Sequence, residues 1–172
     1  MKSNQSLGKL YIVATPIGNL NDISQRAIET LRSVDIILCE NTVHSRKLLQ
    51  HYQIVPKRID KITDHQTAKD VSGIAGGLLN GQSVAYISDA GTPMISDPGG
   101  NLVSFAHQHN VPVVPVPGTS AVITALSVAG FAATPFCFLG FFPEKAQDRR
   151  KQAEVCSRSK QATVFFESPR RI

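Results

Sequence analysis

The amino-acid sequence predicts an α/β fold built on a parallel sheet, and two observations support that prediction. Short apolar runs rich in Val, Ile, Leu and Phe alternate with longer helical patterns along the whole chain of 172 residues, as in proteins whose parallel strands are covered by helices. Hydrophobic residues make up 42% of the chain and charged residues 18%, which is typical of a globular protein and not of a disordered one. One full domain therefore fits into the chain, with part of a second.

Strands and helices are expected to alternate through the first domain. Its first helix carries apolar residues at helical spacing from Ile23 to Val34, and Asp22 is the expected N-cap because a carboxylate can accept an unpaired backbone N–H. Pro112 and Pro115 interrupt the last strand, which places that strand toward an edge of the sheet or shortens its ladder. The expected strands cover residues 10–14, 36–39, 58–63, 83–88 and 111–116, and the expected helices cover residues 23–34, 45–52, 66–79 and 101–109.

Pro117-Gly118 punctuates the chain, and the domain boundary is expected there. Residues 1–117 then form an N-terminal α/β domain, and residues 118–172 begin a C-terminal α/β domain. In the latter, helices are expected over residues 120–129 and 144–159 and strands over residues 136–142 and 163–167. Two helices and two strands cannot bury a normal core, and this domain is therefore expected to be incomplete. The unpaired edge of its sheet would favour dimerisation, domain swapping or aggregation.

Charge and cysteine content narrow the class of protein. Lys and Arg outnumber Asp and Glu by 18 to 13, a net charge of +5, which fits a polyanionic partner such as RNA and equally fits a mildly basic enzyme. The three cysteines are widely spaced, so neither a disulfide framework nor a zinc site is expected from them. His107 and His109 do not share a helical face, so no metal site is expected there either. No apolar run approaches the roughly 18 residues that span a bilayer, and a cytoplasmic protein is expected.

Function is expected in the loops that follow strands, because ligands of open parallel sheets bind beyond the carboxyl ends of the strands. None of these loops carries the glycine pattern of a dinucleotide or ATP site. The loop from Ser88 to Gly100 joins glycines and prolines to Asp89 and Asp97 and to several hydroxyls, which offers rigid backbone groups and acceptors for a cation or for ribose hydroxyls. The alternative is an ordinary turn in which Asp97 caps the next helix. Loops of this length are usually functional or disordered, and this one is too rich in proline to be disordered.

Several motifs in matching order carry a resemblance to a known family. The segment GTPMISDPG at residues 91–99 resembles the GTPxxSDPG loop of the tetrapyrrole (corrin/porphyrin) methylases, in particular of the branch that 2'-O-methylates a cytidine of small-subunit (16S) ribosomal RNA. ATPIGNL at residues 14–20, VPGTSA at 116–121, LGFFP at 139–143 and FESPRR at 166–171 resemble further segments of that branch. The resemblance covers nearly the whole chain from Lys9 onward.

The resemblance implies a cofactor, a reaction and partners. It implies a two-domain α/β protein, usually a homodimer, that holds S-adenosyl-L-methionine in the cleft between its domains. The implied reaction is methyl transfer to the ribose 2'-hydroxyl of a cytidine in small-subunit ribosomal RNA, free or in the 30S particle. The cofactor-binding residues that it implies are Pro16, Asp89, Ala90, Gly91, Thr92, Pro93, Ile95, Ser96, Asp97, Gly118, Thr119, Ser120 and Ala121.

The sequence departs from the family branch near the expected catalytic side. Residues 40–43 read ENTV where the branch has EDTR, residues 62–67 read ITDHQT where it has a segment like YHEHNE, and Gly100 replaces a tyrosine. The remaining candidates for proton handling are Glu40, Asp64 and His65. A solvated loop histidine and a carboxylate favoured at a helix N-terminus are the structural alternatives for His65 and Glu40.

Basic side chains are the candidates for RNA contacts. Arg46 and Lys47 follow the second expected strand and could contact phosphate. The run Arg149-Arg150-Lys151 offers the same chemistry farther along the chain. A solvated helix face is the structural alternative for both groups.

Three functions stay open. The first is the RNA ribose methyltransferase. The second is a methylase of small tetrapyrroles, which the matches at ATPIGNL and ESPRR disfavour. The third is a non-catalytic module that keeps the cofactor cleft, suggested by the departures at Asn41, Val43, Thr63 and Thr67.

Overall fold

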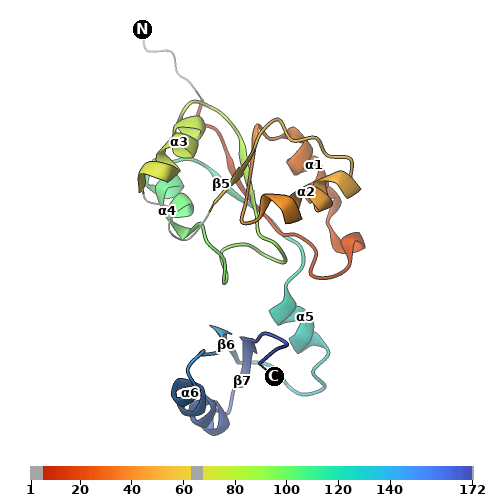
Figure 1. Ribbon diagram of the computed structural model, residues 1–172, viewed down its shortest axis with the longest axis vertical. Coiled ribbons are helices and arrows are strands. Elements are labelled where there is room, and N and C mark those ends of the chain that lie inside the picture. Colours follow the sequence, from red (N-terminus) through yellow and green to blue (C-terminus); the bar gives the residue numbers. More distant parts are fainter. Residues whose placement is uncertain (1–5, 63–67, 172) are drawn as a thin grey trace. The chain divides into compact units, whose positions relative to one another are not determined.

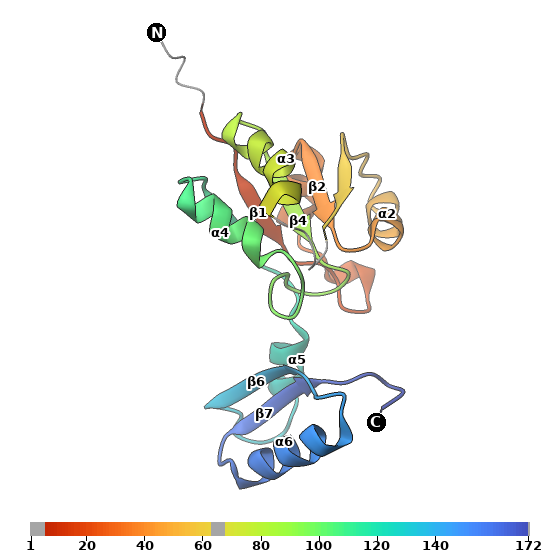
Figure 2. The ribbon, with the colours of Figure 1, turned by 60° about the vertical axis from the view of Figure 1, so that its left-hand side comes forward.

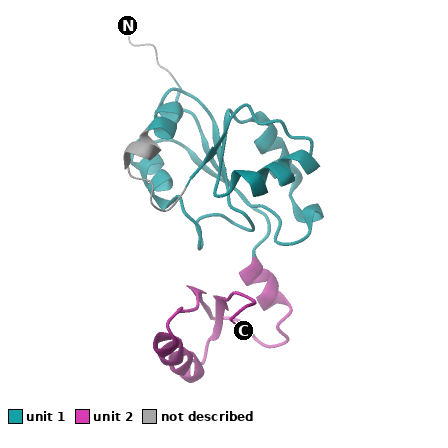
Figure 3. Cartoon of the chain, in the orientation of Figure 1, with its two compact units in different colours: residues 1–120 teal, residues 121–172 magenta. Residues whose placement is uncertain are grey.

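The computed structural model describes residues 6–62 and 68–171. The chain divides into two compact units, residues 1–120 and residues 121–172 (Figures 1 and 3). Each unit has its own parallel sheet. The expectation of an α/β fold with a parallel sheet is confirmed. The expected change of domain at Pro117-Gly118 lies a few residues before the division at Ser120.

The first unit is a three-layer arrangement of a five-stranded parallel sheet between two pairs of helices (Figures 1 and 2). The strand order is β3-β2-β4-β1-β5. Helices α1 and α2 pack on one face, and α3 and α4 pack on the other. The strands are β1 (Leu10–Val13), β2 (Ile36–Cys39), β3 (Ile59–Lys61), β4 (Val84–Ile87) and β5 (Val113–Val116), and the helices are α1 (Gln25–Ser33), α2 (Thr42–His51), α3 (Ala68–Leu79) and α4 (Gly100–Gln108), with a short 3-10 helix η1 (Leu20–Asp22) before α1.

Side chains of each central strand alternate between the two faces of the sheet. In β2, Ile36 and Leu38 pack toward α3 and α4, while Ile37 and Cys39 pack toward α1 and α2. Because both faces are covered, every residue of β2 and of β4 is buried, and each strand reads as a continuous apolar run. This burial is why the short runs in the sequence predicted the strands well.

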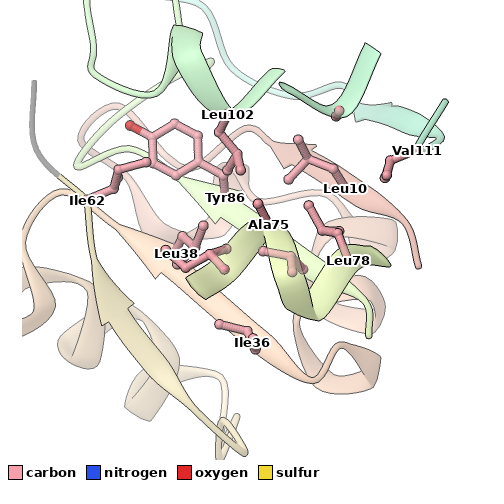
Figure 4. Packing of buried hydrophobic residues seen from close by; sticks show 12 residues of the cluster. Leu10, Ile36, Leu38, Ile62, Ala75, Leu78, Tyr86, Leu102 and Val111 are labelled. Atoms are coloured by element: carbon pink, nitrogen blue, oxygen red, sulfur yellow. The ribbon is translucent and has the colours of Figure 1, made fainter. Parts of the chain in front are cut away.

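Tyr86 connects the core to the loop that follows β4. Its ring lies among buried side chains of the face covered by α3 and α4, near Leu102 (Figure 4). Its hydroxyl donates a hydrogen bond to the carbonyl oxygen of Pro98 at 2.8 Å. The next residue, Gly99, has a φ of 108° and would place a Cβ only 3.2 Å from the Tyr86 ring, so glycine is required there. The core thus fixes the far end of this loop.

The edge position expected for the proline-containing strand is confirmed, because β5 stands at the end of the strand order and, among the described strands, pairs only with β1. The expected helix starts were less accurate. Asp22 is not the N-cap of α1: it belongs to η1, and the Ser24 hydroxyl accepts the N–H of Ala27 at 3.1 Å instead. Helix α2 begins at Thr42, earlier than residue 45. The N-cap of α4 is Gly99, and not Asp97.

The second unit consists of α5 (Ala121–Ser127), β6 (Phe136–Phe141), α6 (Ala146–Arg158) and β7 (Ala162–Phe166). Strands β6 and β7 pair in parallel, with α6 as the connection between them. Among its described residues only Val122 is a buried hydrophobic side chain, and α6 buries none. Large apolar side chains are therefore exposed in this unit.

No helix in the part of the chain that the structure describes combines the length and the apolar character needed to cross a membrane.

Candidate ligand site at the carboxyl edge of the sheet

The strand order of the first unit creates a crevice at the carboxyl ends of β1 and β4. These two strands are neighbours in the sheet. The chain leaves β1 toward α1 on one face and leaves β4 toward α4 on the other. The two loops therefore diverge from adjacent strands, which is the switch point where open α/β sheets bind ligands.

A cavity of about 530 Å³ lies at this point. Its walls come from the loop after β1, the start of the loop after β4, and the first turns of α2. It is lined by Thr15, Pro16, Ile17, Gly18, Leu20, His44, Ser45, Lys47, Leu48, Ser88, Asp89 and Ala90. Its size lies within the range of roughly 300–1,000 Å³ typical of small-molecule and cofactor sites.

Hydrogen bonds fix the loops of this edge to one another. Thr15 and Gly91 exchange both backbone bonds, at 2.9 and 3.0 Å, and the Thr15 hydroxyl donates to the carbonyl of Ser88 at 3.2 Å. The Thr119 hydroxyl donates to the carbonyl of Thr15, and the Thr92 hydroxyl donates to the carbonyl of Thr119 at 2.9 Å. Three loops that are far apart in the sequence thus form one braced edge.

Two glycines allow the loops to approach so closely. Gly91 has a φ of 81°, a left-handed conformation that side chains with a Cβ disfavour. At Gly118, an added Cβ would lie 2.9 Å from the Cβ of Ala14, so only glycine fits against the end of β1. Gly91 of the GTPMISDPG motif and Gly118 of the VPGTSA motif therefore allow the loops of the site to pack closely.

Asp89 gives the cavity its acceptor. The Oδ1 atom of this carboxylate is buried and accepts no hydrogen bond from the described residues, although Asp89 lines the cavity. A buried carboxylate oxygen without a donor costs free energy. A ligand that presents a hydroxyl or an amino group to Asp89 would remove that cost.

Helix α2 provides the opposite wall. Asn41 caps it, since its Oδ1 accepts the backbone N–H groups of Val43 at 3.0 Å and His44 at 3.2 Å. With the helix starting there, His44, Lys47 and Leu48 are three and four residues apart and share one face, and all three line the cavity. Both His44 and Lys47 are exposed, so the rim of the cavity carries basic side chains.

Cys39 ends β2 near this edge and stays a thiol. Burial raises its pKa above the usual 9.0, and the Sγ donates to the carbonyl of Asp60 at 3.6 Å.

Within the described residues no three His, Cys, Asp or Glu side chains are grouped as metal ligands.

The structure brings together part of the expected cofactor-binding set. Pro16, Asp89 and Ala90 line the cavity, whereas Gly91, Thr92, Gly118 and Thr119 brace the loops around it. The remaining members do not line it: Pro93 is buried, Asp97 and Ser120 are half-buried, Ile95 and Ser96 are exposed, and Ala121 is the first residue of α5 in the second unit.

Among the described residues, the two side chains expected to bind RNA line different depressions. Lys47 lines the cavity, but Arg46 lines a different depression with residues from the end of α2. Glu40 is half-buried directly after β2. Asp64 and His65 lie outside the described residues.

The lining residues that the expected site set does not contain are Thr15, Ile17, Gly18, Leu20, His44, Ser45, Leu48 and Ser88. The motif at residues 14–20 could have indicated the first four, and the loop that starts at Ser88 could have indicated the last. His44 was missed because α2 was expected to start at residue 45, whereas the helix begins at Thr42. Asn41, three residues before His44, was the available signal, since asparagine is a preferred N-cap.

The fold and the crevice define an α/β protein with a cavity of small-molecule size at the carboxyl edge of its parallel sheet. Residues 9–172 match the tetrapyrrole (corrin/porphyrin) methylases, and the chain belongs to that family.

Curated relatives are similar over most of this chain. It is 47% identical to the ribosomal RNA small subunit methyltransferase I of Vibrio cholerae, over 95% of this chain and 56% of that protein. It is 44% identical to the protein of the same name from Escherichia coli O157:H7, over 100% of this chain and 61% of that protein. The chain thus spans somewhat more than half the length of these relatives.

Solved structures share the fold at lower identity. The methyltransferase CobJ has a TM-score of 0.66 at 15% identity, covering 92% of this chain and 67% of CobJ. Uroporphyrin-III C-methyl transferase from Thermus thermophilus, complexed with S-adenyl homocysteine, has a TM-score of 0.57 at 23% identity, covering 80% of this chain and 61% of that protein.

Proposed function

We propose that this protein is an S-adenosylmethionine-dependent methyltransferase that acts on small-subunit ribosomal RNA, with the ribose 2'-oxygen of a cytidine as the target atom. The observation that carries the proposal is the cavity at the switch point, where a buried Asp89 oxygen lacks a donor among the described residues. The names of the curated relatives support the RNA substrate. The motifs of residues 14–20 and 166–171 support the ribose-methylating branch.

The chemistry of the cavity fits S-adenosylmethionine. This cofactor has no phosphate, and the chain has no glycine-rich phosphate loop. The Asp89 carboxylate suits a hydroxyl or ammonium donor, and Ile17, Leu20 and Leu48 give the cavity an apolar side for a nucleobase. Pro16, Asp89 and Ala90 would hold the cofactor directly, with the braced residues Gly91, Thr92, Gly118 and Thr119 fixing their positions.

When bound, S-adenosylmethionine supplies a methyl group on a sulfonium, so that a bond from the ribose oxygen to the methyl carbon forms while the carbon–sulfur bond breaks and sulfur keeps the electron pair. The residues of this chain position the reactants, which contributes much of the rate of such a step. The proton of the 2'-hydroxyl has to leave, and Glu40, Asp64 and His65 are the proposed acceptors.

Contacts to RNA are proposed at the cavity rim. Lys47 is exposed beside the cavity, where an ammonium group can neutralise a phosphate next to the target ribose. Arg46 would contact phosphate farther along the strand, since it lines a separate depression. The 30S particle as substrate, a homodimer and a cytoplasmic location are further parts of the proposal, supported by the family resemblance.

A non-catalytic member of the family is the second candidate. Val43 is 68% exposed where the branch carries arginine, and Asn41 caps α2 where the branch carries an acid. The start of α2 thus lacks an acid and an arginine that the branch has.

Methyl transfer separates the two candidates. The purified protein is incubated with methyl-labelled S-adenosylmethionine and with 30S particles from cells that lack their own enzyme. Label in a cytidine 2'-O-methyl group supports the first candidate. Cofactor binding by calorimetry without labelled RNA supports the second, and neither binding nor label refutes both.

A further inference from the structure

The wall that α2 gives to the cavity in the first unit contains a buried hydroxyl group, that of Ser45. Ser45 lies on the buried side of α2 together with Leu48 and Leu49, is only 2% exposed, and lines the same cavity as Asp89. Its Oγ is buried and forms no hydrogen bond of normal geometry with the described residues. A buried hydroxyl without such a partner costs free energy, so packing alone would favour alanine at this position.

Helix α2 does not use this hydroxyl for its own hydrogen bonds. A serine or threonine inside a helix can donate to a carbonyl three or four residues earlier. The backbone N–H of Ser45 donates to the carbonyl of Asn41 at 2.9 Å, but its hydroxyl does not follow. Four other helical hydroxyls do donate in this way, at 2.7 to 2.9 Å: those of Thr30, Ser33, Ser127 and Ser157.

The Cys39 thiol is a neighbour of both Ser45 and Asp89. Burial raises the pKa of this thiol, the Ser45 hydroxyl opposes part of that rise, and the Asp89 carboxylate adds to it. The thiol is a weak partner for Ser45, because sulfur accepts hydrogen bonds poorly and its own proton points to the carbonyl of Asp60. Two polar groups without a strong partner thus lie near the same atom, one on the α2 wall and one on the loop after β4.

The two groups differ in what they require from a ligand. A carboxylate oxygen of Asp89 only accepts, whereas the Ser45 hydroxyl both donates and accepts. An ammonium group could donate to Asp89 but could not accept the Ser45 proton, and His44 and Lys47 already bring basic side chains to the rim. Two adjacent hydroxyls meet both requirements, since one donates to Asp89 while the other exchanges a hydrogen bond with Ser45.

We infer that Ser45 and Asp89 together bind the two adjacent hydroxyls of a ribose. Which ribose this is rests on the proposed function, in which both the cofactor and the RNA carry one. The ribose of S-adenosylmethionine has both hydroxyls free, whereas a ribose inside an RNA strand has its 3'-oxygen bonded to phosphate. The cofactor ribose is therefore the expected occupant, and Ser45 is a cofactor-binding residue outside the motif loops.

The first test measures S-adenosylhomocysteine binding to the whole chain by calorimetry. Ser45→Ala should weaken binding roughly threefold to tenfold, since one hydrogen bond between uncharged groups contributes an effect of that order. Its stability in urea should be unchanged or higher, because the substitution removes a buried hydroxyl without a strong partner. A merely structural role would lower stability together with affinity. The matched control is Ser33→Ala, which removes a hydroxyl that bonds within α1 outside the cavity and should leave binding unchanged.

A double-mutant cycle tests whether Ser45 and Asp89 bind the same group. Ser45→Ala should cost less affinity in the Asp89→Asn background than in the wild type, because a diol that has lost one contact is held less well at the other. Fully additive losses would mean that the two residues contact separate parts of the ligand, and would overturn the inference.

Nucleoside analogues identify the ribose. In competition with labelled S-adenosylhomocysteine, adenosine should bind the wild type more tightly than 2'-deoxyadenosine and 3'-deoxyadenosine do, and Ser45→Ala should lose the preference over one of the two. Equal binding of all three to the wild type would overturn the inference. The same comparison with cytidine and 2'-deoxycytidine tests the target ribose: discrimination there, and none with adenosine, would overturn the assignment to the cofactor.

Failure of this inference can be told apart from failure of the proposed function. Loss of affinity in Ser45→Ala, without methyl transfer to 30S particles by the wild type, would support the ribose contact and remove the proposed function. Methyl transfer by the wild type, with unchanged cofactor affinity in Ser45→Ala, would do the reverse. A wild type that binds no S-adenosylhomocysteine would overturn both.

Discussion

Replacing Asp35 by asparagine should lower the stability of the first unit by about 1 kcal/mol near neutral pH. Asp35 lies just before β2, and its carboxylate accepts the Lys57 ammonium at 2.8 Å and the backbone N–H and hydroxyl of Ser83 at 2.9 and 2.8 Å. It thereby joins the starts of β2 and β4. The hydrogen bond from Lys57 first, and then those from Ser83, lower the pKa of Asp35 from 3.8 to about 2.

The magnitude follows from that shift. At 1.36 kcal/mol per pH unit, the lowered pKa corresponds to at most about 2 kcal/mol. The Asp35 side chain is 35% exposed and that of Lys57 is 63% exposed, so solvent screening reduces the value to about 1 kcal/mol. A lowered carboxyl pKa stabilises the folded state above the unfolded pKa near 4, and this stabilisation is lost as the pH falls from about 4 to about 2.

Tyrosine fluorescence in urea is the assay, because all three tyrosines, Tyr11, Tyr52 and Tyr86, lie in the first unit. The difference in unfolding free energy between wild type and Asp35→Asn should be about 1 kcal/mol at pH 6 and should vanish toward pH 2. Lys57→Met, which removes only the exposed ion pair, should cost less. A difference that stays constant from pH 6 to pH 2 would refute the assignment of the stabilisation to the ionised carboxylate.

Three further predictions concern the site. Asp89→Asn should weaken S-adenosylmethionine binding in calorimetry roughly tenfold or more, since it removes a charged acceptor. It should not lower the stability of the unliganded first unit, because the buried Oδ1 has no donor among the described residues; a loss of stability equal to the loss of binding would contradict this. Gly118→Ala should cost about 1–3 kcal/mol of stability through the 2.9 Å contact with the Ala14 Cβ, whereas Gly73→Ala in α3, whose added Cβ meets nothing within 4 Å, should be neutral or stabilising in the same urea titration. Asn41→Ala should destabilise by about 1 kcal/mol and Asn41→Asp should not, since aspartate caps a helix equally well; equal losses for both variants would exclude a capping role.

The sequence predicted the elements well and their ends less well, for a physical reason. Strands such as β2 and β4 are buried on both faces, so burial alone forces a continuous apolar run that can be read from the sequence. Helix starts depend on which of several neighbouring side chains accepts the first free N–H groups. Both Asp22 and Ser24 are good caps, and the fold selected Ser24.

The site was predictable in its loops and not in its walls. The motifs at residues 14–20 and 88–99 indicated where a ligand binds, and Pro16, Asp89 and Ala90 do line a cavity there. The wall formed by His44 and Lys47 depends on the start of α2 at Thr42. Arg46 and Lys47 are adjacent in sequence, yet the turn of the helix directs them to different depressions.

The sequence by itself determined the fold class, the burial of the strands, the family and the loops that carry the motifs, because these depend on local composition and on short residue patterns. Only the tertiary structure decided the insertion of β4 between β2 and β1, which brings Thr15 against Gly91 and Thr119 and leaves an Asp89 oxygen buried without a donor from the described residues. It alone also brought Ser45 and Asp89 to the walls of one cavity. These contacts join residues that are far apart in the chain. They depend on the strand order and on the packing of the helices, which local sequence patterns do not specify.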